Sequence, residues 1–353
     1  MSLVPATQSS STPAVLRGHT PPMELLRSFG PDGCLMVSRE QALGYVAELA
    51  GGHYENFSVL SRLVPARLRP HFAAVYAFCR WADDLGDETG RDDAAKARSM
   101  ALLAWWRGEL RRCFAGEATH PVFMALAPTV REFDLPIEPF DDLIRAFEMD
   151  QQITRYQTFG EVVGYCQCSA NPVGRLVLML GGYRPERDSE KRFAMSDSIC
   201  TALQLTNLWQ DVRRDLLERD RVYVPATDTG VDAATLKDWM VRGGPEGGYQ
   251  PDVRIAYINM MRGLVEKTWP LFRAGGALPG MLNDDLRKVV WLFSAGGQSV
   301  LHAVERSGCT TLWQRPRLGK LGKASLVLRA MLGIGLGRGT SAGAQSVSSG
   351  GQL

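Results

Sequence analysis

Apolar side chains recur along most of the chain every three to four residues, which is the period of an α-helix. The strict alternation of a half-buried strand is absent, and no internal repeat is visible. Proline and glycine interrupt the pattern and mark the expected ends of the helices. The pattern predicts an all-α, single-domain fold with helices over residues 39–50, 70–87, 94–115, 121–133, 138–150, 159–181, 187–219, 251–273, 279–305 and 321–334.

The two ends of the chain differ from the middle. Residues 1–22 are rich in Ser, Thr and Pro, and residues 339–353 are rich in Gly, Ser and Ala. Such segments bury too little apolar surface to offset the entropy lost on ordering. We therefore expect a disordered tail at each end and one folded domain over residues 23–338.

Composition excludes several classes of protein. The 353 residues include 40 Lys and Arg against 38 Asp and Glu, so 40 − 38 gives a formal charge of +2. No nucleic acid partner is expected, because binding to phosphate backbones needs a basic surplus. Seven cysteines without zinc-type spacing indicate reduced thiols. The sequence shows neither a secretory signal nor the ~18 apolar residues of a membrane span, so we expect a cytoplasmic protein whose membrane contact is peripheral.

The predicted helix over residues 70–87 carries acids although its apolar residues point in nearly every direction, as in a buried helix. One face follows steps of four, three and four and is polar: Tyr76, Arg80, Asp83 and Asp87, with Asp84 beside them. Carboxylates on a buried helix are costly unless they are paired or bind a metal. Arg80 can neutralise only one of them, so a further cation is expected here.

The predicted helix over residues 187–219 repeats this feature near its end. A polar stripe, opposite an apolar one, steps by three, four, four and three: Gln204, Asn207, Asp211, Asp215 and Glu218. Like charges four residues apart repel each other on an isolated helix. A cation should therefore face this stripe as well.

A single D-x-x-x-D pattern is most often a solvated helix face, but two such stripes in one chain favour a functional site. Mg²⁺ is held by a few carboxylates together with water and substrate phosphates. Two acidic helices facing each other across an apolar cavity could hold several Mg²⁺ ions around a diphosphate. The metals would stabilise the charge that develops as a carbon–oxygen bond breaks, and the apolar walls would shield a carbocation from water.

Residues 76–87 and 207–215 resemble the two aspartate-rich motifs of the squalene/phytoene synthase family. Residues 148–159, followed by Tyr165 and Cys166, resemble a third segment of that family, and the resemblance covers roughly residues 40–330. It implies a helical bundle of the isoprenoid-synthase type around a central apolar cavity. It also implies a Mg²⁺-dependent enzyme that processes prenyl diphosphates.

Three segments resemble one branch of the family, the bacterial hydroxysqualene synthases of hopanoid biosynthesis: residues 53–57, 61–70 and 169–175. The branch implies ionisation of presqualene diphosphate and capture by water, which gives hydroxysqualene and diphosphate without NADPH. Condensing relatives usually carry Ser and Lys at residues 54–56, where Glu55 of this chain should weaken a diphosphate site.

Two other functions stay open. One is a presqualene diphosphate or squalene synthase that condenses two farnesyl diphosphates. The other is a catalytically inactive assembly or binding factor on the same fold, against which the intact acids argue. A generic terpene cyclase fits the metal chemistry but not the signature at residues 169–175.

The resemblance assigns roles residue by residue. The metal ligands would be Asp83, Asp84, Asp87, Asp211 and Asp215. The substrate would contact Phe57, Arg80, Gln204, Asn207 and Arg221, with Phe57 on the prenyl chain. The catalytic groups would be Tyr76, Arg80, Tyr165, Asn171 and Tyr223. The segment before Arg221 is one residue longer than the common form of the family, and Asp220 replaces its usual Gly.

Two further segments each admit two interpretations. In residues 169–175, Pro172 could kink a helix while Gly174 allows close packing, or Asn171 could orient the attacking water. Arg175 could hold diphosphate or a helix end. Residues 315–338 hold six basic and no acidic side chains among leucines. They form either an ordinary surface helix or a helix that lies on anionic lipid. Other enzymes of the squalene route could be partners of the protein.

Overall fold

The computed structural model describes residues 16–18, 20–33, 35–52, 63–185, 190–245 and 247–332. Two segments singled out in the sequence lie outside the described residues: residues 53–57, which include Phe57, and residues 339–353. Within the described part the chain is built of helices, joined at one point by an isolated parallel bridge between Arg155 and Val222. The all-α prediction is confirmed.

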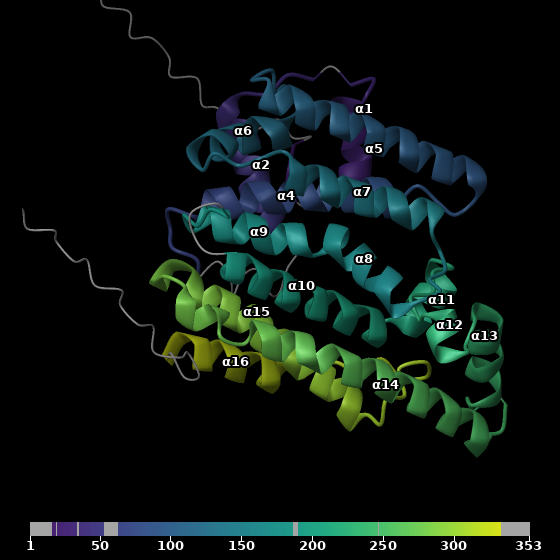
Figure 1. The fold of residues 1–353 in the computed structure, drawn as a ribbon. Helices are drawn as coiled ribbons and strands as arrows, with labels where there is room; N and C mark the ends of the chain where they lie inside the picture. The colour runs from purple at the N-terminus through teal and green to yellow at the C-terminus, as the bar shows by residue number, and fades with distance from the viewer. Residues whose placement is uncertain are drawn as a thin grey trace, which may run out of the picture.

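Six helices form the N-terminal half, in the upper part of Figure 1. They are α1 (Pro22–Phe29), α2 (Arg39–Gly52), α4 (Arg69–Asp87), α5 (Asp93–Phe114), α6 (Pro121–Glu132) and α7 (Glu138–Gln152). Proline lies in the first turn of α1, α4, α6 and α7, where its missing N–H leaves no hydrogen bond unmade. Asp92 begins α5 by accepting a hydrogen bond from the backbone N–H of Ala95.

The other helices lie below and to the right of these in Figure 1. They are α8 (Phe159–Ser169), α9 (Asn171–Leu180), α10 (Glu190–Gln210), α11 (Val212–Glu218), α12 (Ala226–Thr229), α13 (Ala233–Arg242), α14 (Pro251–Gly275), the 3₁₀ turn η1 (Leu278–Met281), α15 (Asp284–Arg306) and α16 (Lys320–Leu332). Helix α10 is central to this half, because it packs against α8, α9, α14 and α15.

The interior consists of two hydrophobic clusters. One lies among α2, α4, α5 and α6 and contains the buried rings of Phe78, Trp81 and Trp106. The other lies among α8, α10 and α14 and contains Tyr165 and Trp209. Helix α4 carries the first acidic motif and belongs to the first cluster, whereas α10 and α11 carry the second motif and belong to the second. The two motifs therefore meet where the clusters meet.

Several details of the predicted helices are wrong. The helix predicted over residues 159–181 ends at Ser169, and α9 begins at Asn171. The helix predicted over residues 187–219 is broken at Asp211, whose φ of −103° and ψ of 11° leave the helical region. Helices α1, α12 and α13 were not predicted. Helix α13 buries only Leu236, so its apolar pattern is too sparse to indicate a helix.

Candidate active site

The first acidic motif lies on the last turns of α4, where the helix passes from the core to the surface. Asp84 is 2% exposed, while Asp83 is half-buried. Arg80 pairs with both carboxylates: its Nη1 lies 3.5 Å from Asp83 Oδ2, and its Nη2 contacts Asp84 Oδ1. The guanidinium donates to both acids because it presents several N–H groups in a fork, but its single positive charge balances only one of the two carboxylates. Tyr76 lies half-buried one turn earlier on the same helix.

An arginine that was not predicted joins the two motifs. Arg219, which follows α11, places Nη2 2.9 Å from Asp87 Oδ2 and Nη1 3.5 Å from Asp215 Oδ1. The carboxylates of the first and second motifs thus converge on one cation. The sequence prediction that these stripes face each other and require positive charge between them agrees with this geometry. A signal for Arg219 was present, since it lies four residues after Asp215.

A second arginine connects the motifs to a buried aspartate. Arg221 is 8% exposed; its Nη2 donates to Asp87 Oδ1 at 2.9 Å, and its Nε donates to the carbonyl oxygen of Asp150 at 3.1 Å. The carboxylate of Asp150 accepts hydrogen bonds from the hydroxyls of Tyr165, at 3.0 Å, and Tyr223, at 2.8 Å. The predicted residues Arg221, Tyr165 and Tyr223 are therefore brought together by Asp150.

Asp150 and Tyr156 were not among the predicted site residues. Tyr156 stacks on Tyr223 with the ring centroids 5.4 Å apart, and Tyr165 completes this group of three rings. The sequence held a signal for Asp150, because it continues the apolar stripe of Leu143 and Ala146 on α7. A carboxylate in such a stripe is buried and needs partners.

The extra residue before Arg221 does not displace this arginine from the site. Asp220 adopts a φ of +49°, in the left-handed region that glycine favours. Asp is among the few other residue types that visit this region with little strain. The chain therefore turns at Asp220 as it would at glycine. The Asp220 carboxylate also pairs with Arg155, with Nη2 and Oδ1 2.9 Å apart.

Burial raises the pKa values of the acids in this region. Desolvation raises the pKa of Asp84 to about 7 although Arg80 opposes it, and raises the pKa of Asp215 to about 7, assisted by the charge of Asp211. Desolvation raises the pKa of Asp150 to about 6, although Arg221 and the Tyr223 hydroxyl oppose it. The arginines therefore compensate this concentration of negative charge only in part, and additional cationic charge would stabilise it.

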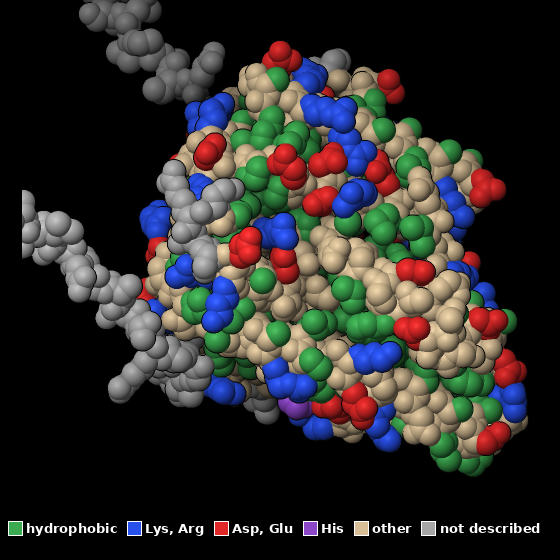
Figure 2. All heavy atoms as spheres, viewed as in Figure 1, with side chains coloured by type: hydrophobic (Ala, Val, Ile, Leu, Met, Phe, Trp, Pro, Cys, Tyr) green, Lys and Arg blue, Asp and Glu red, His purple; other side chains and the backbone are tan. Residues whose placement is uncertain are grey.

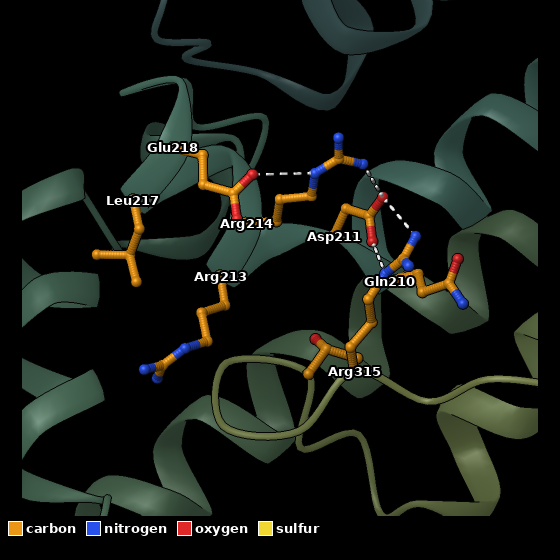
Figure 3. A pocket seen from close by; sticks show the side chains of 8 residues that line it. Gln210, Asp211, Arg213, Arg214, Leu217, Glu218 and Arg315 are labelled. Atoms are coloured by element: carbon orange, nitrogen blue, oxygen red, sulfur yellow. Dashed lines mark hydrogen bonds and ion pairs between the residues drawn. The ribbon is translucent and has the colours of Figure 1, made fainter.

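The place where the two motifs meet, at Asp83, Asp84, Asp87, Asp215 and Arg219, is called the acidic junction. Asp211 precedes Asp215 by one turn and lines a pocket of about 130 Å³ (Figure 3). Arg315 donates to the carboxylate of Asp211 from both Nε and Nη2, and Nη2 lies 2.9 Å from Oδ2. On the other side, Nη1 of Arg214 lies 3.8 Å from the same Oδ2. Gln210, which ends α10, donates to the carbonyl oxygen of Pro316 at 2.6 Å. The start of the predicted basic segment, Arg315 and Pro316, therefore contacts the second acidic motif through Asp211 and Gln210.

Among the other predicted residues, Asn171 is buried at the start of α9, where its Oδ1 accepts a hydrogen bond from the hydroxyl of Thr201 at 2.9 Å. Pro172 lies in the first turn of α9, so the chain has a break between two helices there and not a kink within one. Arg175 forms a bidentate pair with Asp197 of α10 at 3.0 and 2.7 Å. Gln204 is half-buried and Asn207 is exposed on α10.

The donor chemistry of the junction fits Mg²⁺. The side chains are carboxylates with oxygen ligands, they come from two elements, and a cationic group already lies between Asp87 and Asp215. Within the described residues, no group of three or more Asp, Glu, His and Cys side chains is close enough to hold a metal by itself. An ion here would therefore take its other ligands from water and from the phosphates of a substrate.

Comparison with known proteins gives consistent results. The sequence model of the squalene/phytoene synthase family matches residues 50–322. A hydroxysqualene synthase of Sinorhizobium fredii is 31% identical over 233 residues, which cover 65% of this chain and 72% of that protein. A phytoene synthase of Arthrospira platensis is 26% identical over 288 residues, or 79% of this chain and 89% of that protein. The crystal structure of a squalene synthase from Alicyclobacillus acidocaldarius is 39% identical with a TM-score of 0.63, and the match covers 76% of this chain and 95% of that one.

Proposed function

Because this chain belongs to the squalene/phytoene synthase family, whose members process prenyl diphosphates, we propose that it is a hydroxysqualene synthase. The proposed reaction ionises presqualene diphosphate and adds water to the resulting carbocation, giving hydroxysqualene and diphosphate. The observation that carries the chemistry is the convergence of the two acidic motifs on Arg219. The choice of branch rests on relatives of 31–33% identity that are hydroxysqualene synthases.

Mg²⁺ would be held by Asp83, Asp84 and Asp87 of α4 and by Asp211 and Asp215 at α11. When bound, it would neutralise the charge that builds up on the departing diphosphate. Asp211 would have to exchange Arg315 for the metal, because both use the same carboxylate oxygens. Arg80, Arg219 and Arg221 present guanidinium groups at this junction, and such groups match phosphate oxygens in geometry.

The tyrosines would act on the hydrocarbon side of the junction. Tyr156, Tyr165 and Tyr223 form one group of rings, and aromatic faces stabilise a nearby cation. Asp150 holds the rings of Tyr165 and Tyr223 in place by accepting a hydrogen bond from each hydroxyl group. Asn171, held by Thr201, is the residue that we propose to orient the attacking water. The apolar cavity that would enclose the C30 chain includes Phe57 and stays a prediction.

A condensing reaction is the second candidate, favoured by the 39% identity to a squalene synthase of known structure. The test is product analysis by mass with purified protein and Mg²⁺, in which presqualene diphosphate and farnesyl diphosphate are supplied separately, each with and without NADPH. We expect hydroxysqualene from presqualene diphosphate alone. Presqualene diphosphate or squalene formed from farnesyl diphosphate would instead establish the condensing reaction.

Variants of the acids test the proposed metal site. Asp83→Asn and Asp215→Asn should each lower turnover by at least about 10²-fold, because a group that stabilises developing charge typically contributes that much. Asp93→Asn, which changes an exposed acid at the start of α5, is the matched control and should retain activity. Circular dichroism should show all three variants folded. Full turnover in both motif variants would exclude this role for the acids.

A further inference from the structure

The first acidic motif lies at a position in its helix that is unfavourable for negative charge. Asp83, Asp84 and Asp87 belong to the last two turns of α4, and Glu88 follows directly. The C-terminal end of a helix carries a partial negative charge, so acids placed there weaken its last turn. Residues 84–87, which form that turn, include no Lys or Arg. The turn that carries proposed metal ligands therefore needs support from other parts of the fold.

Two side chains from neighbouring helices hold the backbone of this turn. Nε2 of Gln151, on α7, and the hydroxyl of Ser99, on α5, each donate to the carbonyl oxygen of Gly86 over 3.0 Å. Ser99 and Gly86 are both buried. Helix α4 packs against both α5 and α7 in the upper part of Figure 1. The carbonyl group of Gly86 is therefore held from two helices at once.

These two donors replace hydrogen bonds that α4 cannot make by itself. The last carbonyl groups of an α-helix have no partner further along the same helix, and helix ends fray for this reason. The carbonyl oxygen of Asp84 accepts from the backbone N–H of Glu88, just beyond the helix, at 3.0 Å. Gly86 lies two residues further on, where Gln151 and Ser99 supply the hydrogen bonds. The two side chains thus keep the final turn of α4 helical.

The residue before Gln151 on α7 orders the other side of the site. The carboxylate of Asp150 accepts hydrogen bonds from Tyr165 and Tyr223, and its carbonyl oxygen accepts one from Nε of Arg221. One turn of α7 therefore holds the tyrosine rings through Asp150 and the end of α4 through Gln151. Because a helix keeps neighbouring residues at fixed distances, these bonds set the position of the acids relative to the rings.

We propose that Gln151 and Ser99 are positioning residues: by holding the carbonyl group of Gly86, they fix the acids of α4 opposite Asp215. This role rests on the proposed function, because those acids serve it as ligands of Mg²⁺. Mg²⁺ requires near-ideal octahedral geometry. A loosened turn should therefore raise the Mg²⁺ concentration that the enzyme needs more than it lowers the rate at saturating Mg²⁺.

Hydrogen–deuterium exchange of the full-length protein tests whether Gln151 holds the turn. Gln151→Met removes the donor and keeps a side chain of similar length. Exchange over residues 84–90 should become about fivefold faster, which is the typical effect of one hydrogen bond on a local equilibrium. Gln152→Met is the matched control and should change nothing there, because Gln152 is exposed on the same helix and its Nε2 contacts Sδ of Met100 at 3.9 Å. Ser99→Ala, which removes the other donor, should act in the same direction as Gln151→Met.

Metal binding tests whether the turn positions the acids. Electron paramagnetic resonance measures the binding of Mn²⁺, as a substitute for Mg²⁺, in the presence of inorganic diphosphate and without turnover. Gln151→Met should weaken this binding by about tenfold, as is typical of residues that orient metal ligands, whereas Gln152→Met should leave it unchanged. With presqualene diphosphate as substrate, the Mg²⁺ concentration at half-maximal rate should rise by a similar factor. The rate at saturating Mg²⁺ should fall less than about threefold.

Several results would overturn the positioning role. They are unchanged exchange over residues 84–90 in Gln151→Met, unchanged Mn²⁺ binding, equal effects of Gln151→Met and Gln152→Met, or a lower saturated rate with an unchanged Mg²⁺ requirement. If circular dichroism shows that Gln151→Met is not folded, Ser99→Ala decides by the same criteria. Absence of Mn²⁺ binding in the wild type would overturn the metal site and this role with it. A product other than hydroxysqualene would overturn the proposed reaction alone, because exchange and Mn²⁺ binding are measured without turnover.

Discussion

Buried charge at the residue scale is held by several partners at once in this protein. Asp150 accepts from two tyrosine hydroxyls and lies beside the guanidinium of Arg221. Removing an ionised group from water costs several kcal/mol, which is recovered only when its hydrogen bonds are well made. Such a group is therefore sensitive to substitution. The same arrangement fixes Tyr165 and Tyr223, so Asp150 should matter for both stability and activity.

Asp150→Asn should lower the free energy of unfolding by about 2–4 kcal/mol, because it leaves Arg221 buried without its full counter-charge. It should also lower turnover at least tenfold through the two tyrosines. Asp142→Asn on the same helix is the matched control, since its pair with Arg145 is largely exposed and should contribute under about 1 kcal/mol. Urea unfolding monitored by circular dichroism measures both changes. Equal effects of the two substitutions would show that Asp150 is not held as described.

The neutral ring of His120 predicts a pH dependence of stability. Its folded pKa of about 3 lies below the unfolded value of 6.5, so the unfolded chain binds more protons between these pH values. The contribution of His120 to the free energy of unfolding is therefore complete above pH 6.5 and decreases as the pH is lowered. At pH 5 it is smaller by about 2 kcal/mol. The raised pKa values of Asp84 and Asp215 act in the opposite direction, because the folded state binds more protons at those sites between about pH 4 and 7.

The contribution of His120 is consequently measured as a difference between two proteins. His120→Asn keeps a side chain able to begin α6 but removes the titrating ring. Urea unfolding without added metal, at pH 7 and pH 5, gives the change in stability for each protein. The wild type should lose about 2 kcal/mol more than the variant between these pH values. An equal change in both would mean that the His120 ring can accept a proton in the folded state.

Close helix packing is the main feature at the scale of elements. Helices α9 and α10 meet at Gly174, where an added Cβ would lie 2.5 Å from both Cys200 Sγ and Ser196 Oγ. The expectation that Gly174 permits close packing is therefore confirmed. The contact also positions Asn171, which begins α9 and accepts a hydrogen bond from Thr201 of α10.

Gly174→Ala should destabilise the protein by about 1–3 kcal/mol, because overpacking forces the two helices apart. Gly164→Ala on α8 is the matched control, since an added Cβ there meets nothing within 4 Å. That substitution should raise stability by up to about 1 kcal/mol through helix propensity. Urea midpoints of the two variants should therefore move in opposite directions. A stabilised Gly174→Ala protein would contradict the close contact.

The molecule as a whole shows both signs of charge interspersed with hydrophobic side chains on the face in Figure 2. None of the helices described here is long and apolar enough to cross a membrane. At the lower edge of Figure 1, α16 packs on α15, with Arg329 over the ring of Trp291 at 5.4 Å. Leu328 and Met331 of α16 are exposed. We propose that the basic segment from residue 315 rests on anionic lipid, where substrate and product would reside.

Neutralising this segment should weaken binding to vesicles. The double variant Arg317→Gln, Arg329→Gln should lower the affinity for vesicles of anionic lipid by roughly 30-fold, since each charge near such a surface contributes about 1 kcal/mol. Binding of the wild type should fall with salt. Lys96→Gln, which changes an exposed lysine of α5 outside the basic segment, is the control. Sedimentation with vesicles measures all three proteins, and unchanged binding of the double variant would exclude the segment as the lipid contact.

Sequence reasoning could find the helices and the acids because both depend on local pattern. A three-to-four-residue period requires no knowledge of distant residues, and carboxylates on an apolar helix are conspicuous wherever the chain goes. It could not find the break at Asp211, because the pattern of polar and apolar positions continues through it. It assigned no role to Asp150 or Arg219, whose partners Arg221 and Asp87 lie 71 and 132 residues away, counting 221 − 150 and 219 − 87.

By itself, the sequence determined an all-helical chain with two acid-bearing segments and the family resemblance that goes with them. Only the tertiary structure decided which arginine pairs with which acid. Arg219 pairs with both Asp87 and Asp215. Arg221 pairs with both Asp87 and Asp150, and Arg315 pairs with Asp211. The physical reason is that helical periodicity is set within a few residues, whereas the neutralisation of a buried charge depends on whichever distant side chain the packing brings within a few ångströms.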